Sequence, residues 1–271
     1  MTQFSNLFVV YDPTQEAQPA LDRAAIIAEA NAAALHVFSC IFSETVKSSG
    51  QSADIKHYIA EAQSQLDSAV ASVVARGIPV STEVEWDKDW YQAVVRASTK
   101  NAADMVLKSS YKHSPGTRIL NRTSDWTLIR GCLCPVLLVK GRKPREIPRV
   151  LAAIDINARK SSYERLNQRV VSVAKEILAR ETMEVHIVNA FTDFKAVPDR
   201  QELVRICGVE STNIHIKNGD PEKVIVAQAK ALDVSLVVVG NSARSGLAAA
   251  LHGNTVEKML DKLRCDVLTM P

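Results

Sequence analysis

The chain has 271 residues, which allows one large domain or two ordinary ones, and we expect two compact units. Hydrophobic residues make up 46% and charged residues 23%, which excludes an intrinsically disordered chain, a collagen-like repeat and a small disulfide-rich protein. The formal net charge of +3 is too small for the basic stripe of a dedicated nucleic-acid-binding protein, so no direct nucleic-acid binding is expected.

The apolar segments and the cysteines bear on cellular location. The longest apolar runs, such as Val136–Val139 and Leu236–Val239, fall far short of the roughly 18 residues that a membrane span needs, so no span is expected. The first residues read as a strand rather than as a secretory signal. Five cysteines, an odd number scattered through apolar segments, suit reduced, buried thiols better than disulfides. We therefore expect a cytoplasmic protein.

The two halves of the chain repeat one series of short apolar segments, each typical of a strand buried on both faces. In chain order the matching pairs are Asn6–Pro13 with Arg149–Ile156, Leu35–Ile41 with Val185–Phe191, Asp104–Leu107 with Ser235–Val238, and Leu133–Val139 with Arg264–Met270. The last two pairs share an offset of 131 positions, and the apolar runs of the first pair end at Asp12 and Asp155. This internal repeat predicts two domains of one plan.

Amphipathic stretches alternate with these strands. They carry apolar residues three and four positions apart, as in Val224, Ala227 and Ala231, which gives each stretch one buried face. The stretches are Ala17–Ala34, Ile55–Arg76, Tyr91–Asn101, Tyr163–Arg180, Pro221–Ala231 and Thr255–Leu263. Pro221 suits a first helical turn, and Asp220 before it is predicted to cap that helix. The alternation predicts an α/β fold in each half: an open parallel sheet with helices on both faces and right-handed crossovers.

The boundary between the halves is predicted in Lys140–Pro148, where a glycine, two prolines and clustered charges interrupt the apolar pattern. The predicted domains are residues 1–141 and 149–271. The basic residues of this connector also allow a phosphate site, but a solvated linker is the simpler interpretation.

The segment Val237–Glu257 has the local features of a phosphate-binding loop. A strand ends at Gly240, small residues follow, and a helix is expected to begin near Asn254 or Thr255. Glycine lets backbone N–H groups approach an anion, and a helix N-terminus favours negative charge. Because Asp155 ends a strand at the same edge of the sheet, we expect the two segments to converge on one crevice.

This segment resembles the universal stress protein family, whose nucleotide-binding members carry Gly, two residues, Gly, nine residues, Gly and then Ser or Thr. Gly240 and Gly253 match this pattern, whereas Ala243 and Asn254 depart from it, with Thr255 next in the chain. Two of the four signature positions are therefore altered. The sequence leaves open whether these changes weaken nucleotide binding or remove it.

The resemblance assigns roles in the second domain by position. It places Asp155 beside the base and sugar, the backbone at Ala190 against the adenine, and residues 240–254 around the phosphates. It implies ATP or AMP with Mg as the ligand. Arg244 in this loop would add a charge-assisted phosphate contact, although an arginine on a loop is more often simply solvated.

The resemblance covers essentially the whole chain, because Asp104–Lys140 is similar to the first repeat of tandem family members. It implies a Rossmann-like parallel sheet of five strands in each half. It also implies that the halves pair as an internal pseudo-dimer through Val136–Val139 and Val267–Met270, edge to edge. Fusion of the halves in one chain gives this pairing a high effective concentration. The sequence does not decide whether two chains also form a homodimer.

The first half has lost the glycines of the loop. The residues in the places of Gly240, Ala243, Gly253 and Asn254 are Ser109, Lys112, Arg122 and Thr123. Side chains at these places are expected to block a backbone cradle, so this degenerate domain is not expected to bind a nucleotide in the manner of the family. Charge for an anion remains at Lys108, Lys112, Arg118 and Arg122.

Several other residues are most simply explained by packing. Cys132 and Cys134 have a spacing that a metal or redox pair could use, but without further ligands two small buried residues are the simpler interpretation. His36 and His186 occupy similar positions in the second strands and are expected to be satisfied, partly buried groups.

The remaining candidates are weak. His113 and His252 lie near the two loops without an identifiable carboxylate partner, and Trp86 and Trp90 are expected in a core or an interface. The sequence has no nucleophile elbow and no Walker loop. We therefore predict no catalytic residue and no resident metal site.

Three functions are compatible with these features. The first is a non-enzymatic stress-response protein with an adenine nucleotide as regulatory ligand of the second domain. The second is an adaptor or carrier for an apolar or lipid-like ligand or a protein partner, without nucleotide. The third, slow hydrolysis of the nucleotide, is the least expected, because Asp155 is the only carboxylate that the argument places at the site.

Overall fold

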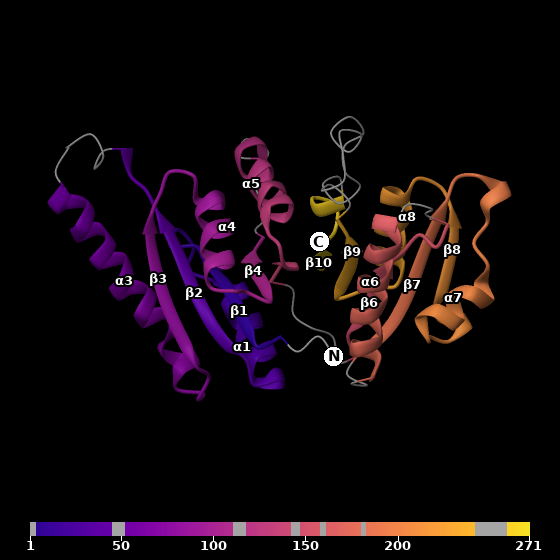
Figure 1. The fold of residues 1–271 in the computed structure, drawn as a ribbon, viewed down its shortest axis with the longest axis horizontal. Helices are drawn as coiled ribbons and strands as arrows, with labels where there is room; N and C mark the ends of the chain where they lie inside the picture. Colours follow the sequence, from indigo (N-terminus) through magenta and orange to yellow (C-terminus); the bar gives the residue numbers. More distant parts are fainter. Residues whose placement is uncertain are drawn as a thin grey trace. The chain divides into compact units, whose positions relative to one another are not determined.

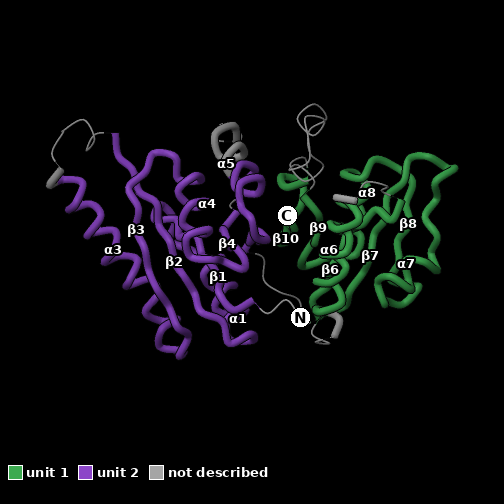
Figure 2. Tube along the Cα trace, viewed as in Figure 1, with its two compact units in different colours: residues 1–2, 142–271 green, residues 3–141 purple. Residues whose placement is uncertain are grey.

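The computed structural model describes residues 4–44, 52–110, 118–141, 147–157, 161–179, 183–241 and 259–271. The chain divides into two compact units, one of residues 3–141 and one that contains residues 142–271, here named the N-terminal and the C-terminal unit (Figure 2). The expected pairing of Val136–Val139 with Val267–Met270 concerns the placement of one unit against the other and stays a prediction. Among the described residues, no helix has both the length and the apolar character needed to cross a membrane.

The N-terminal unit contains one parallel sheet of five strands in the order β3-β2-β1-β4-β5 (Figure 1). The strands are β1 (Asn6–Tyr11), β2 (Ala34–Ile41), β3 (Val80–Trp86), β4 (Met105–Ser109) and β5 (Val136–Val139). Its helices are α1 (Pro19–Asn31), α3 (Ser52–Val74), α4 (Trp90–Lys100) and α5 (Arg118–Gly131). The central strand β1 is buried along its middle, with Leu7, Phe8 and Val9 fully enclosed, because helices cover both of its faces.

The C-terminal unit repeats this topology, with a parallel sheet in the order β10-β9-β6-β7-β8. The strands are β6 (Arg149–Ala153), β7 (Glu184–Phe191), β8 (Ile214–Asn218), β9 (Leu236–Gly240) and β10 (Asp266–Met270). The helices are α6 (Ser161–Ala179), α7 (Arg200–Cys207) and α8 (Pro221–Ala231), with 3₁₀ turns η1 (Phe194–Ala196) and η2 (Ser211–Asn213). The α/β fold predicted for each half, with a parallel sheet, is thus confirmed.

Local details of the second half also agree with the sequence pattern. Pro221 begins α8, and the Asp220 side chain accepts a hydrogen bond from the Glu222 backbone N–H at 3.0 Å, as predicted for a helix cap. The predicted helix Thr255–Leu263 lies mostly outside the described residues. Of its last part, Met259, Leu260 and Leu263 are buried, whereas Asp261 and Lys262 are exposed.

The apolar pattern missed the outermost strands and two helices. β3 and β8 each form the free edge of their unit's sheet at the end distant from β5 and β10, and their side chains are mostly half-exposed or exposed. An edge strand needs polar residues to stay soluble, so its apolar signal is weak. The helices α5 and α7 were missed because they are rich in polar residues, and α7 has only 8 residues.

Candidate functional site

Asp155 lies directly after β6, at the carboxyl edge of the C-terminal sheet, and its side chain is exposed. One of its carboxylate oxygens, Oδ1, accepts a hydrogen bond from the Asn157 backbone N–H at 3.1 Å. Asn167 of α6 holds the same turn from the other side: its Oδ1 accepts from the Asp155 N–H at 3.2 Å, and its Nδ2 donates to the Asp155 carbonyl. The turn therefore presents the carboxylate to solvent in a fixed position.

Asn189 of β7 ties this turn to the neighbouring strand. The side chain is fully buried, its Oδ1 accepts from the Ile156 backbone N–H at 3.1 Å, and its Nδ2 donates to the Ala190 carbonyl at 3.0 Å. The backbone at Ala190 was predicted to contact the adenine, and its carbonyl thus already accepts a hydrogen bond from within the unit. Sequence reasoning passed over Asn189, although a lone amide within the apolar run Val185–Phe191 was a usable signal.

Gly240 ends β9, and its structural role is close packing against α6. A Cβ atom at this position would lie 2.3 Å from Leu166 Cγ and 2.4 Å from Leu166 Cδ2, far inside van der Waals contact. The next residue, Asn241, is buried and donates its backbone N–H to the Met270 carbonyl at 2.7 Å. Glycine is therefore required here by a helix, whatever the following loop binds.

The structure brings three of the predicted site residues to one edge. Asp155 lies two residues after β6, and Ala190 and Gly240 lie in the last two residues of β7 and β9; these strands are adjacent and parallel, so their carboxyl ends meet. The other predicted residues lie outside the described residues: Ala243, Arg244, Gly253, Asn254 and Thr255. Their roles around the phosphates stay predictions.

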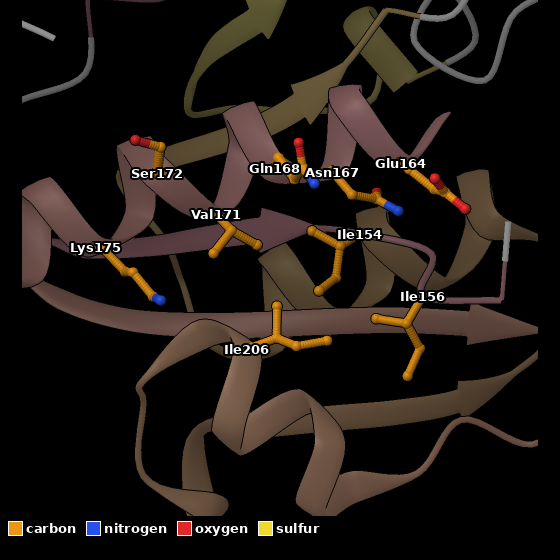
Figure 3. A pocket seen from close by; sticks show the side chains of 9 residues that line it. All are labelled: Ile154, Ile156, Glu164, Asn167, Gln168, Val171, Ser172, Lys175 and Ile206. Carbon is orange, nitrogen blue, oxygen red and sulfur yellow. The ribbon is translucent and has the colours of Figure 1, made fainter. Parts of the chain in front are cut away.

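A cavity of about 510 Å³ opens next to Asp155, between α6 and α7 (Figure 3). Its lining consists of Ile154, Ile156, Glu164, Asn167, Gln168, Val171, Ser172, Lys175 and Ile206. Four of these side chains are branched apolar groups, and the polar ones come from α6. Nothing in the sequence pattern predicted this cavity, because α7 itself was not predicted.

The matching edge of the N-terminal unit is filled by its own side chains. Ser109, in the place of Gly240, is buried, and its Oγ accepts the Ala20 backbone N–H of α1 at 3.0 Å. Gln18 bridges the turn after β1, where its Nε2 donates to the carbonyls of Asp12 (2.7 Å) and Gln15 (2.8 Å). A hydroxyl and an amide at this edge are thus engaged in internal hydrogen bonds.

Lys108, one of the predicted anion contacts, is also engaged within the N-terminal unit. Its Nζ forms an ion pair with Asp125 at 2.8 Å, donates to the Ser109 carbonyl, and lies 5.2 Å from the centre of the Trp90 ring. Both charged side chains are less than one fifth exposed, so Asp125 neutralises the charge locally. Lys112 and the side chains of Arg118 and Arg122 lie outside the described part of the chain.

The two strand histidines are held by neighbours. His36 Nδ1 lies 2.8 Å from Ser81 Oγ and Nε2 lies 3.1 Å from Glu83, while burial lowers the pKa of the ring below 6.5. His186 Nδ1 lies 3.2 Å from His215 Nε2. Burial, assisted by the charge of His186, lowers the pKa of His215 to about 4. Burial also lowers the pKa of His186, so the imidazole rings are neutral near pH 7, with the Glu83 and Glu184 carboxylates beside those of His36 and His186.

No metal cluster is found among the described residues, where no three His, Cys, Asp or Glu side chains gather in a suitable way. Cys132 is buried and Cys134 half-buried, and neither forms a disulfide. Trp86 packs against Phe42 and Tyr58, with ring centres 5.6 and 6.4 Å apart. His113 and His252 lie outside the described segments.

Comparison with known proteins gives one consistent result. The sequence profile of the universal stress protein family matches residues 3–140 and 170–271. Universal stress protein E of Photorhabdus laumondii is 28% identical over 301 residues, which span 100% of this chain and 96% of the relative. Universal stress protein E of Escherichia coli K12 is 26% identical, spanning 100% and 95%.

Solved structures agree in fold. A putative universal stress protein from Pseudomonas aeruginosa superposes with a TM-score of 0.80 at 25% identity, covering 99% of this chain and 94% of the other. A universal stress protein from Archaeoglobus fulgidus gives a TM-score of 0.75 at 17% identity, covering 99% and 97%. The likeness therefore extends through both units.

Proposed function

Because the chain belongs to the universal stress protein family, we propose that it is a cytoplasmic, non-enzymatic stress-response protein whose C-terminal unit binds an adenine nucleotide as a regulatory ligand. One observation carries the proposal: the exposed carboxylate of Asp155, fixed at the carboxyl edge of β6 beside the end of β9 at Gly240. The proposal assigns ATP or AMP, with Mg, to this edge.

The topology supports this location. From β6 the chain crosses to β7 on one side, while β9 lies on the other side of β6, so the connections after β6 and β9 leave the sheet in different directions. Parallel sheets bind ligands at such a switch point, outside the carboxyl ends of the strands. A carboxylate held there is suited to accept hydrogen bonds from the hydroxyl groups of a ribose.

The contrast between the units supports assigning the ligand to the C-terminal one. In the N-terminal unit, Ser109, Gln18 and the Lys108–Asp125 ion pair fill the same edge. Asp155 Oδ1 already accepts the Asn157 amide, so the proposal gives this carboxylate a binding role and no role as a general base.

The experiment compares equivalent aspartates in the two units. Asp12 caps its own turn through the Thr14 N–H at 3.0 Å, as Asp155 does through Asn157, so Asp12→Ala is a matched control for Asp155→Ala. Binding of Mg-ATP and of AMP is measured by equilibrium dialysis, after mass spectrometry of any molecule released from the purified protein. We expect saturable binding that weakens about tenfold in Asp155→Ala, for loss of one or two hydrogen bonds, and is unchanged in Asp12→Ala.

Two results would overturn the proposal. The first is absence of binding at millimolar nucleotide, and the second is equal weakening in both variants. Release of inorganic phosphate that disappears in Asp155→Ala would instead support nucleotide hydrolysis. Release of an apolar molecule on denaturation would favour the carrier function, for which the apolar cavity beside Asp155 is the supporting observation.

A further inference from the structure

The cavity between α6 and α7 is an open groove with an apolar floor and opposite charges at its two ends. Figure 3 shows Ile154, Ile156 and Val171 along the floor and Ile206 on the opposite wall. Glu164 and Lys175 lie at opposite ends of the row of α6 side chains (Figure 3). Eleven residues separate them on α6, which is three helical turns or about 16 Å.

The second crossover of the C-terminal unit, which contributes one wall of the groove, is short. In the N-terminal unit this crossover is α3, a helix of 23 residues that packs on β2 and β3. In the C-terminal unit the helix α7 has 8 residues and packs on β8 and against α6. The two units therefore differ in the length of this helix, 23 residues in α3 against 8 in α7.

The polar wall of the groove is exposed along its length, while Ile154 and Val171 of its floor are only 5% and 6% exposed. The side chains of Glu164, Gln168, Ser172 and Lys175 are all exposed, and no ion pair involves Glu164 or Lys175 within the described part of the chain. Near the Ile156 end, the Asn157 Nδ2 donates to the Ala196 carbonyl at 2.6 Å, which places η1 beside the groove mouth. In and after η1, Phe194 is 75% exposed and Val197 is 51% exposed, which adds apolar surface there.

We propose that this groove docks an amphipathic α-helix of a partner protein, running antiparallel to α6, with acidic residues at Lys175 and basic residues at Glu164. The direction follows from electrostatics. A helix favours acidic side chains in its first turn and basic ones in its last, so an antiparallel helix brings its acidic end to Lys175 and its basic end to Glu164. Apolar anchors at positions i, i+4 and i+7 of the partner fill the space between the isoleucines and Val171.

Peptide docking in this groove does not require a bound nucleotide, although the turn that carries Asp155 contributes Ile154 and Ile156 to the groove floor. An enclosed pocket would favour a small molecule, but here the polar wall is solvent-exposed over three turns. Length, exposure and the separation of charge all match a helix of about 12 residues.

The test uses the full chain and a synthetic, fluorescently labelled helical peptide of about 12 residues, with leucine anchors, glutamates in its first turn and lysines in its last. Fluorescence anisotropy is expected to show saturable binding. The variant Lys175→Glu should weaken binding about tenfold, while Arg165→Glu, a reversal at an exposed α6 residue outside the lining, should change it less than twofold.

A charge-swapped peptide, with lysines first and glutamates last, makes the test independent of any loss of folding. It should bind the double variant Glu164→Lys/Lys175→Glu better than it binds the unmodified protein. The peptide assay contains no nucleotide, so its outcome is separate from that of the nucleotide proposal.

Three results would overturn the inference. They are no saturable binding at 1 mM peptide, equal weakening by Arg165→Glu and Lys175→Glu, and failure of the swapped peptide to prefer the double variant. Sedimentation measurements provide one more. If the protein self-associates and Lys175→Glu makes it monomeric, the groove is an interface between two copies of this chain.

Discussion

Gly240→Ala gives the sharpest test of why a glycine ends β9. The added Cβ would lie 2.3 Å from Leu166 Cγ, which is a branch carbon and not a free methyl end, so rotation of the terminal methyl groups alone does not relieve the contact, and χ1 of Leu166 or the position of α6 has to change. Overpacking of this kind costs about 1–3 kcal/mol, and we expect about 2 kcal/mol because Leu166 is only half-buried and α6 can shift slightly. With a typical urea m-value, this moves the unfolding midpoint by about 1 M.

The variant Leu166→Ala supplies the control. Alone it should cost about 1 kcal/mol for the lost apolar contact, and in combination it should remove most of the effect of Gly240→Ala, giving a coupling energy of about 2 kcal/mol. All three tryptophans, Trp86, Trp90 and Trp126, belong to the N-terminal unit. Far-UV circular dichroism therefore follows both units, while tryptophan fluorescence follows one.

The expected result is a shift of the circular dichroism transition with little change in the fluorescence transition. An unchanged urea midpoint in Gly240→Ala, or a double variant as unstable as the sum of the two single ones, would refute the packing argument. In that case the glycine would be explained by ligand binding alone. If this packing makes glycine necessary, a bulky substitution at Gly240 disturbs the fold and cannot test nucleotide binding, whereas Asp155→Ala can.

Three further predictions concern buried polar groups. Ser109→Ala should lower the stability of the N-terminal unit by about 1–2 kcal/mol in urea-induced fluorescence changes, because the Ala20 N–H loses its acceptor. Lys108→Met should cost about 3 kcal/mol by the same assay, and Asp125→Asn added to it should restore part of the loss. The pKa of His215 is lowered to about 4, so its neutral form stabilises the fold above about pH 6.5, and this stabilisation is lost as the pH falls toward 4. The variant His215→Gln should therefore lose less stability on acidification, by about 1 kcal/mol at pH 5 after allowance for solvent screening.

The order of the inner strands could be predicted because central parallel strands are buried on both faces. Such strands appear as continuous apolar runs, as in Arg149–Ile156 and Val185–Phe191, and the repeat of these runs predicted two sheets of one plan. The carboxyl edge that gathers Asp155, Ala190 and Gly240 followed from the parallel arrangement. These properties depend on the pattern of apolar residues within each segment, which the sequence shows directly.

Contacts between residues far apart in the sequence could not be predicted in this way. The fit of Leu166 against Gly240, the Asn189 bonds to the turn after β6, and the groove left by the short helix α7 depend on how helices lie on the finished sheet. The same holds for Lys108 and Asp125, whose charges cancel only once β4 and α5 are side by side. Periodicity states which face of an element is buried, but not which side chain it meets, so these features arise only when the chain has folded.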